Sequence, residues 1–430
     1  MQRTEAPGAS FMAIGEHATC RGFYGFRDRE KKIPVDAETH FEIGSITKQF
    51  TAAAILQLRE SHKLDLDAKL SVFLPDAPHA NEVTLRQLLS HTSGMPEYLA
   101  GSDINDVATR AITYESLIGR VGKKPLDFEP GSRWAYSNTG YILLGRVIEV
   151  VSHETYRHYV QTHLLDRAGM RQTFTVADEH KLPDMAVGYW IENGHVVRAP
   201  TIHDSFGWAA GNLVSTLDDL EKWNRALAGG RIVSSSDYAS MIEANRTDQN
   251  QDTGYGLGLF VGRFEGELRI GHTGGSFGFT SANENFPELG ARVIVLTNKG
   301  GSPETGEMIA DAVFNRLYPE INRKHLAADP GEDAAVTGVA RKLFASIQDG
   351  RPALELLGRS LGEKMQQGLA SRLNAQFDPY GKPTAFVFKG RKEEGNLIWH
   401  SYLILFGPGN ELLFGVAIDE TGKVSKISNG

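Results

Sequence analysis

The chain has 430 residues, 41% of them hydrophobic and 23% charged, which is the usual composition of a globular protein long enough for two domains, one of them large. Its formal net charge of −8 is spread without long runs of one sign, and this argues against nucleic acid as a partner, because phosphate binding needs a basic face. No stretch reaches the ~18 apolar residues needed to span a bilayer, and the one cysteine excludes a disulfide within the chain.

The first segment predicts a hairpin followed by a long helix. Two strands are expected at 9–14 and 19–26, and Cys20 is expected to be packed within the second strand, which makes it a poor nucleophile. From Ser45 onward, apolar residues at four-residue steps predict a helix with one buried face that ends near residues 62–63. The residues that set this period are Ile46, Phe50, Ala54 and Leu58.

The middle of the chain changes from helices to strands. Residues 65–200 are predicted to be mostly helical and loop-like, and they include a helix at about 139–151. The elements expected after them are a short helix at 220–227, strands at 256–260, 268–273, 280–285 and 291–298, and a helix at 304–317. Strands far apart in the sequence must then share one sheet, with the helical block packed beside it. The pattern therefore predicts an α+β architecture in two lobes.

A second unit is predicted after a linker at 318–336, which is rich in charges and contains Pro319, Pro330 and Gly331. The expected elements beyond it are helices at 340–348 and 362–376 and strands at 383–388, 397–406, 411–418 and 423–427. The predicted organisation is thus a large domain at 1–317, the linker at 318–336, and a small α+β domain at 337–430.

The most informative motif is Ser45-x-x-Lys48, which is the one Ser-x-x-Lys in the sequence and lies at the predicted start of a helix. Residues three apart on a helix share a face, and the first turn favours developing negative charge. A serine hydroxyl is inert until a base takes its proton, and a lysine can do so when its ammonium is desolvated. The alternative interpretation is an N-cap serine with a solvated lysine one turn later.

Two further motifs lie downstream. Tyr136 and Asn138 fall at a loop tip before a predicted helix, where side chains are often presented to a ligand; the alternative is a buried tyrosine with Asn138 as an N-cap. The run Gly-His-Thr-Gly-Gly at 271–275 ends a predicted strand, and its glycines would let a substrate backbone approach and would expose N–H groups. The alternative there is a glycine-rich bulge with a solvated histidine.

Taken together, the three motifs resemble those of the serine β-lactamase-related superfamily. The matching branch contains class C β-lactamases, D-Ala-D-Ala carboxypeptidases, D-aminopeptidases and family VIII esterases of the CubicO type. The resemblance runs from Ala9 to Leu317, and auxiliary signatures stand at 88–96, 128–141, 210–220 and 255–258. It implies a β-lactamase/transpeptidase-like two-lobe fold, with an antiparallel sheet and a helical lobe, followed here by the small C-terminal domain.

The resemblance also implies roles for individual residues. Ser45 would be the acylated nucleophile, Lys48 and Tyr136 would activate it and move its proton, and which of the two is the base stays open. Asn138 would hydrogen-bond the substrate amide or Lys48. The backbone N–H groups of Ser45 and Gly275 would form an oxyanion hole. No cofactor and no metal are implied.

Two features depart from the superfamily pattern. Members that bind a substrate carboxylate often have lysine first in the third motif, whereas this chain has His272, which is expected to be partly protonated near pH 7 and to bind substrate together with Gly274. The helix that usually precedes the first strand is also expected to be missing. The substitution at His272 is similar to the pattern of D-aminopeptidase-like and esterase-like relatives.

The predicted function is a serine hydrolase that acts through an acyl-enzyme on small esters or on amides and peptides of D-amino acids. β-Lactamase or D-Ala-D-Ala carboxypeptidase activity is the alternative, and a non-catalytic ligand-binding relative is the alternative from another class. The resemblance suggests a periplasmic or secreted protein, whereas no signal peptide is visible, so the compartment stays open.

Three smaller expectations complete the prediction. His91, in a turn rich in Ser and Thr, is expected to be structural. His153, His158 and His163 are not expected to bind metal, because spacings of five do not share one helical face. The C-terminal domain resembles a cystatin-like α+β domain, and its role is left open between a cap over the site, an interface in a homo-oligomer and a module that binds cell-wall material.

Overall fold

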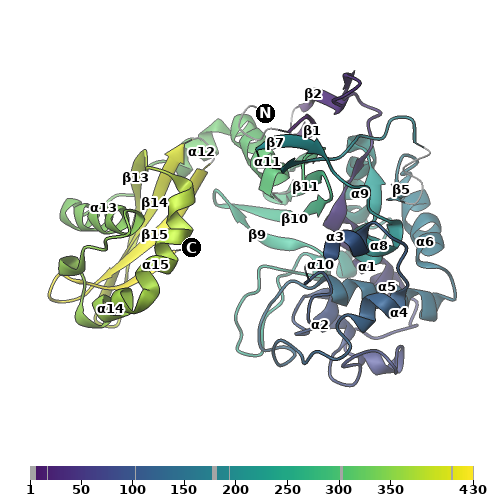
Figure 1. Cartoon of the computed structure of the whole chain (residues 1–430), viewed down its shortest axis with the longest axis horizontal. Coiled ribbons are helices and arrows are strands. Elements are labelled where there is room, and N and C mark those ends of the chain that lie inside the picture. The colour runs from purple at the N-terminus through teal and green to yellow at the C-terminus, as the bar shows by residue number, and fades with distance from the viewer. Residues whose placement is uncertain are drawn as a thin grey trace. The chain divides into compact units, whose positions relative to one another are not determined.

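The computed structural model describes residues 6–16, 18–101, 103–176, 182–192, 194–300, 304–407 and 410–429. Its contacts divide the chain into two compact units, Met1–Leu317 (unit 1) and Tyr318–Gly430 (unit 2), which are both drawn in Figure 1. Within the described ranges, every helix is too short or too polar to cross a membrane.

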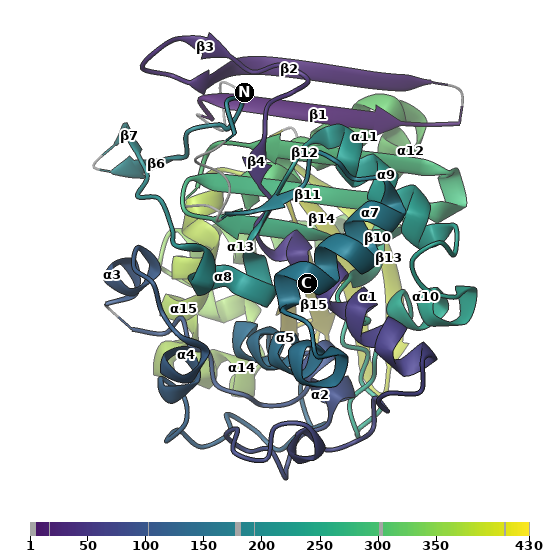
Figure 2. The same cartoon turned by 90° about the vertical axis from the view of Figure 1, so that its right-hand side faces the viewer.

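Unit 1 is built on a seven-stranded antiparallel sheet with the order β3-β2-β1-β12-β11-β10-β9. Its strands are β1 (Gly8–Ile14), β2 (Thr19–Asp28), β3 (Ile33–Pro34), β9 (Phe260–Phe264), β10 (Glu267–Ser276), β11 (Phe279–Phe286) and β12 (Ala291–Thr297). Ala9 pairs with Thr297, so the N-terminal hairpin and the late strands share one sheet, as Figure 2 shows. The predicted α+β fold with a sheet of distant strands is confirmed.

Helices lie on both faces of this sheet. Asn283 of β11 exchanges hydrogen bonds with Asn224 of α9 (Leu217–Ala228), whereas Phe286, an odd number of residues away on the same strand, packs on Phe314 of α11 (Glu304–Leu317). Side chains an odd number of residues apart on a strand point to opposite faces. α9 and α11 therefore cover opposite faces of the sheet, and α11 occupies the face away from the helical lobe.

The helical lobe is centred on α1 (Thr47–Glu60), which a 3₁₀ turn η1 (Gly44–Ile46) precedes. All residues of α1 from Thr47 to Leu58 are buried, so the helix is a core element rather than an amphipathic surface helix. The remaining helices of the lobe are α2 (Leu85–Leu89), α3 (Ile104–Ala108), α4 (Tyr114–Gly119), α5 (Asn138–Ser152), α6 (Tyr156–Tyr159), α7 (Asp166–Ala168), α8 (Asp204–Gly211) and α10 (Ser235–Met241).

Local predictions for unit 1 have mixed outcomes. Residues 65–200 consist mostly of helices and loops, as predicted, but they also contain short strands. These are β5 (Phe174–Thr175), which pairs with β8 (Leu213–Ser215) beside β4 (Phe41–Glu42), and the hairpin of β6 (Tyr189–Glu192) and β7 (His195–Arg198). The strand expected at 256–260 begins only at Phe260, because Gly258 has a φ of +78° and ends any extended run there. Cys20 lies on a strand as expected but is exposed, because β2 is near the edge of the sheet.

Unit 2 is a four-stranded antiparallel sheet of order β13-β14-β15-β16 with helices packed on it. Its strands are β13 (Ala385–Glu394), β14 (Leu397–Gly407), β15 (Asn410–Ile418) and β16 (Val424–Asn429), and its helices are α12 (Pro319–His325), α13 (Ala334–Gln348), α14 (Arg359–Lys364) and α15 (Ala370–Phe377). Phe344 of α13 forms the centre of the core, where it contacts Phe377 and Phe414.

Two predictions for unit 2, a linker and a helix, differ from the structure. The segment predicted as a linker, 318–336, contains α12 and the start of α13, since Pro319 and Asp333 are good N-terminal residues for a helix. The helix expected at 362–376 is interrupted at Gly368, whose φ of +110° divides it into α14 and α15.

A cluster of acidic side chains joins α11 to the sheet. Arg269 of β10 donates to Asp311 and Glu307 of α11, each at 3.1 Å, and its Nε lies 4.0 Å from Glu284 of β11. Gly271 makes room for this arrangement, because a Cβ there would stand 2.4 Å from a Glu284 oxygen. Burial raises the pKa of Asp311 to about 7; Arg269 opposes the rise, and the charges of Glu307, Glu284 and Glu265 add to it.

We expect this cluster to make the stability of the protein fall as pH rises from 4 to 7. Over that range the folded state keeps a proton on Asp311 that the unfolded chain has released, so the folded state binds more protons. Asp311→Asn mimics the protonated form, and its stability relative to wild type should grow with pH and reach about 1–2 kcal/mol at pH 8. This is less than the ~4 kcal/mol of a full three-unit shift, because 26% of the side chain is exposed.

Urea unfolding at several pH values measures this difference. Asp76→Asn changes an exposed loop carboxylate and serves as the control, which should follow the wild-type profile. An Asp311→Asn profile parallel to that of wild type between pH 4 and 8 would contradict the account.

Candidate active site

Ser45 and Lys48 meet where η1 runs into α1. Ser45 is the middle residue of the 3₁₀ turn and Lys48 is the second residue of α1, so their side chains project from consecutive turns on one face. The Lys48 side chain is completely buried, and its Nζ donates to the Ser45 Oγ at 3.0 Å. The structure therefore brings these two predicted residues together, and the solvated-lysine alternative is wrong.

Lys48 is held by acceptors from two other segments. Its Nζ also donates to the Asn138 Oδ1 at 2.7 Å and to the Ala210 carbonyl oxygen at 2.8 Å. Burial lowers the pKa of Lys48 to about 7, and the charge of Glu97 opposes this shift. Close to neutral pH, a large fraction of this lysine is therefore an uncharged amine that can accept a proton from Ser45.

The Ala210 carbonyl reaches Lys48 because α8 is kinked. Trp208 has a φ of +32° and a ψ of −126°, a backbone conformation that a tryptophan seldom adopts. After this kink, the carbonyl of Ala209 accepts from the Thr51 hydroxyl at 2.6 Å and that of Ala210 accepts from Lys48, so both turn towards α1. Backbone strain of this kind is common at functional sites, where it orients groups for a task.

Asn138 is oriented by a carboxylate that the sequence reasoning did not identify. Glu97 Oε2 accepts from the Asn138 backbone N–H at 2.7 Å and from its side-chain Nδ2 at 3.1 Å. This fixes the amide so that its oxygen faces Lys48. The loop that carries Glu97 is anchored by hydrogen bonds from Tyr98 N to the Thr139 hydroxyl and from the Tyr98 hydroxyl to the Phe206 carbonyl.

Tyr136 lies beside both Ser45 and Lys48. Its ring centroid is 4.9 Å from the Lys48 Nζ, and its hydroxyl oxygen is buried with no hydrogen-bond partner within 3.5 Å in the described residues. Burial raises the pKa of Tyr136, and the nearby Ser45 hydroxyl opposes this rise. Tyr136 is therefore a neutral phenol at physiological pH, with a proton that it can give to a neighbour.

His91 holds Tyr136 in place. The backbone N–H groups of Ala135 and Ser137 donate to the His91 carbonyl and to its Nδ1, at 3.0 and 3.1 Å, and the His91 ring lies 4.2 Å from the Tyr136 ring. His91 is 1% exposed, and burial followed by the charge of Lys48 keeps its pKa well below the usual range. A neutral His91 thus accepts hydrogen bonds from the backbone on both sides of Tyr136. The structural role expected for His91 is to position Tyr136.

His272 differs most from its prediction. It is 1% exposed, its Nε2 lies 2.9 Å from the Tyr255 hydroxyl, and its Nδ1 contacts the Thr273 carbonyl at 2.5 Å. Burial and the nearby charge of Lys48 lower the pKa of His272 to about 3. The expectation that His272 is partly protonated near pH 7 is therefore wrong, because burial is not visible in the sequence. The ring is neutral and belongs to a buried aromatic group.

The two glycines at the end of β10 have different surroundings. Gly274 is buried against the segment before Ser45, and a Cβ there would stand 2.0 Å from the Ile43 carbonyl oxygen. Gly275 is exposed, and its backbone lies so near Gly44 that a Cβ on Gly44 would stand 2.7 Å from the Gly275 nitrogen. Gly44 has a φ of +51°, so a residue without a side chain fits both its conformation and its space.

This geometry combines a serine hydroxyl, a buried amine of lowered pKa and a neutral phenol, with an exposed glycine of β10 beside the turn that carries the serine. Such a set can activate the serine and transfer its proton. A match to the Beta-lactamase family covers residues 1–317. The chain belongs to this family.

Individual relatives agree with the family assignment. The chain is 32% identical over 318 residues to a protein of Bacillus subtilis (strain 168) named "Putative penicillin-binding protein PbpX", which covers 74% of this chain and 75% of the relative. One similar solved structure is a D-stereospecific amidohydrolase from Streptomyces sp., with 27% identity and a TM-score of 0.63 over 71% of this chain and 94% of the other. Another is an octameric penicillin-binding protein homologue from Pyrococcus abyssi, with 25% identity and a TM-score of 0.67 over 100% of this chain and 95% of the other. These likenesses support a serine hydrolase.

In this member of the Beta-lactamase family, the three catalytic motifs contain the central groups but not Glu97 and Tyr255, which contact them. Glu97 directly follows the 88–96 signature. A carboxylate next to that signature was the one sign in the sequence that Glu97 could belong to the site. Tyr255, whose hydroxyl meets His272, lies in another auxiliary signature, at 255–258. Neither contact could be assigned without the fold, because Glu97 is 41 residues from Asn138 in the sequence and Tyr255 is 17 residues from His272.

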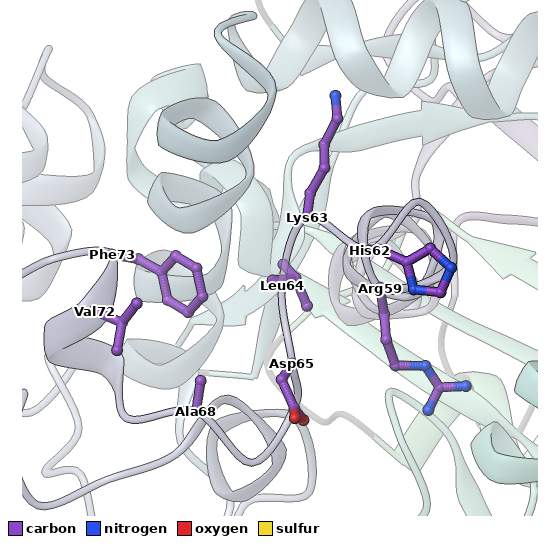
Figure 3. Close-up of a pocket in the computed structure, with 8 residues that line it drawn as sticks. All are labelled: Arg59, His62, Lys63, Leu64, Asp65, Ala68, Val72 and Phe73. Carbon is purple, nitrogen blue, oxygen red and sulfur yellow. The ribbon is translucent and has the colours of Figure 1, made fainter.

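A hollow of about 630 Å³ lies elsewhere, at the other end of α1. It is lined by Arg59, His62 and Lys63, and Arg59 lies about 16 Å along the helix from Lys48 at 1.5 Å per residue. Figure 3 shows that these three basic side chains point away from one another, and Arg59 is paired with the buried Asp237. The hollow is thus separate from the candidate active site and lacks a convergent set of charges.

We expect the ε-amine of Lys48 to titrate near pH 7, in contrast to an exposed lysine near 10.4. Glu97→Gln removes the negative charge that favours the ammonium form, so the pKa of Lys48 should fall further. NMR of ¹³C-labelled lysine measures both values, with the Lys48 signal assigned by its absence in Lys48→Met.

Glu82→Gln, which neutralises an exposed glutamate far along the chain, is the matched control and should leave this signal unchanged. A Lys48 signal that titrates only above pH 9.5 would contradict the assignment. So would a Glu97→Gln variant whose Lys48 titrates as it does in wild type.

Proposed function

We propose that this protein is a serine hydrolase that forms an acyl-enzyme on Ser45 and hydrolyses small esters or amides and peptides of D-amino acids. The observation that supports this most strongly is the hydrogen bond from the buried Lys48 Nζ to the Ser45 Oγ at 3.0 Å. An amine with a pKa of about 7 in that position has the property that a serine nucleophile requires of its base.

Acylation would begin when neutral Lys48 takes the proton of Ser45 and the Oγ attacks the substrate carbonyl carbon. We assign the base role to Lys48, because burial lowers its pKa while burial raises that of Tyr136. Tyr136 would then give its hydroxyl proton to the leaving group and regain one from Lys48, so the amine ends neutral. Water would release the acyl group by the reverse sequence, with Lys48 again as base.

The negative charge of the tetrahedral intermediate would be stabilised by the backbone N–H groups of Ser45 and Gly275. Ser276 pairs with Phe279 across a two-residue turn, and hydrogen-bonded and non-bonded pairs alternate along an antiparallel ladder. The next pair, Gly275 with Thr280, is then expected to be non-bonded, which leaves the Gly275 N–H directed away from β11. Removing one such donor typically costs about 10²–10³ in rate.

The charges near the site favour neutral acyl donors. A neutral His272 gives no cation for a substrate carboxylate, which counts against a D-Ala-D-Ala carboxypeptidase. The Asn138 side chain bonds Lys48 through its oxygen and Glu97 through its nitrogen, so it would act mainly on the lysine. The similarity to a D-stereospecific amidohydrolase supports amides of D-amino acids as one substrate class, with small esters as the other and β-lactams third.

Unit 2 has a counterpart in the octameric homologue from Pyrococcus abyssi, which matches this chain over its whole length. We propose that this protein also forms a homo-oligomer.

Intact-protein mass spectrometry tests the proposed function. Wild type mixed briefly with a nitrophenyl ester, a D-alanyl amide or a penicillin should gain one acyl group with at least one donor, and Ser45→Ala should gain none. Lys48→Ala should acylate at least about 10³-fold more slowly, because the serine then lacks its base.

Lys63→Ala removes an exposed lysine just beyond the other end of α1 and is the control, which should acylate at the wild-type rate. An adduct that persists in Ser45→Ala would reject the assigned nucleophile. A wild type that forms no adduct and turns over no donor would favour the non-catalytic ligand-binding alternative.

A further inference from the structure

The proposed function determines which part of the molecule must contact the leaving group, and the inference below rests on it. Tyr136 would donate the proton that the leaving group accepts, so the leaving atom must come within hydrogen-bond distance of the Tyr136 hydroxyl. A solvent-exposed residue beside the Tyr136 ring is therefore placed to contact the leaving group. Lys48, His91 and Tyr255 contact this ring but are buried.

The accessible neighbour of Tyr136 is Phe260. It is the first residue of β9, an edge strand of the sheet, and the residue is 37% exposed. The rings of Phe260 and Tyr136 are parallel within 5°, with centroids 6.4 Å apart. Trp134 extends this surface, with its centroid 6.4 Å from that of Phe260. We call Trp134 and Phe260 the aromatic shelf.

The aromatic shelf offers ring surface without charge. The Trp134 N–H is buried, so the indole presents no accessible donor. The other rings in contact with Phe260 are Tyr255 and His272, at 4.8 and 4.9 Å. The neutral His272 donates from Nδ1 to the Thr273 carbonyl, accepts at Nε2 from the Tyr255 hydroxyl, and is buried. A carboxylate on the leaving group would meet no counter-charge from these rings.

Leaving the shelf exposed has a free-energy cost that a ligand can recover. A large apolar side chain beside the reacting groups is stabilised when an aromatic group packs on it, since offset aromatic pairs contribute beyond the area that they bury. The Phe260 ring of the shelf lies parallel to the ring of Tyr136, which must itself approach the leaving atom. An aryl group one or two bonds from that atom can therefore reach Phe260.

We propose that the aromatic shelf is the leaving-group subsite and that it selects an uncharged aromatic alcohol or amine. This would make aryl esters and arylamides, rather than substrates that release a free carboxylate-bearing amino acid, the better substrates of the enzyme.

Three butyrate esters that differ only in the leaving group test the subsite: phenyl, 4-carboxyphenyl and ethyl butyrate. For each, kcat/KM is divided by the rate of spontaneous hydrolysis, so that intrinsic reactivity cancels. Wild type should prefer phenyl over 4-carboxyphenyl butyrate. Phe260→Ala should lower kcat/KM for phenyl butyrate by about fivefold to tenfold, the value of one aromatic contact, but for ethyl butyrate by at most about twofold.

A second variant tests the charge argument by gain of function. Phe260→Arg places a cation on the exposed edge strand, where the fold should tolerate it, and should shift the ratio of kcat/KM towards 4-carboxyphenyl butyrate by about fivefold or more. Tyr24→Ala removes another exposed aromatic residue of the same sheet, on β2, and is the control, which should leave every ratio at the wild-type value.

The outcomes separate this proposal from the proposed function. An equal loss for all three esters in Phe260→Ala, or unchanged ratios in Phe260→Arg, would overturn the subsite while Ser45 still acylates. A wild type that turns over none of the three esters but still acylates Ser45 with the D-alanyl amide or the penicillin would also overturn the subsite alone. A wild type that neither forms a Ser45 adduct with, nor turns over, any of these donors would overturn the proposed function and the subsite with it.

Discussion

The structure depends on one buried amine. Lys48 lies in the core of unit 1 and donates hydrogen bonds to Ser45 in the turn before α1, to Asn138 at the start of α5, and to the Ala210 carbonyl near the end of α8. Three segments distant in the sequence thus meet at one nitrogen. An ammonium in that position costs free energy, and the protein reduces this cost by letting the amine lose its proton near neutral pH.

Other parts of the fold keep this amine in position. The strained backbone of Trp208 turns a carbonyl towards it, and Glu97 orients Asn138 so that an oxygen faces it. His91 holds the backbone on both sides of Tyr136. Backbone strain and buried polar contacts at these residues lower the stability of the fold, and in return they fix the geometry of the site. Such an exchange of stability for activity is usual at functional sites. The same burial keeps the His272 ring, which lies beside Tyr136, neutral.

The sequence predicts what depends on local spacing. The helical period after Ser45 places Lys48 on the same face, and the loop before Asn138 places Tyr136 at a helix start; the sheet of distant strands also follows from the order of elements. Quantities set by tertiary packing do not follow. The neutrality of His272 and the contact between Glu97 and Asn138 require knowledge of burial and of contacts between distant segments. Element boundaries shift where glycines adopt a positive φ, as in the segment before β9.

The central claim is that acylation requires the uncharged form of Lys48. Single-turnover acylation with a neutral nitrophenyl ester between pH 5 and 9 tests it most directly, because the burst of nitrophenolate reports the first chemical step alone. The account predicts a rate constant that rises with pH through one ionisation near 7 and then levels off. A rate constant that is independent of pH over this range, or that rises only above pH 9, would contradict it.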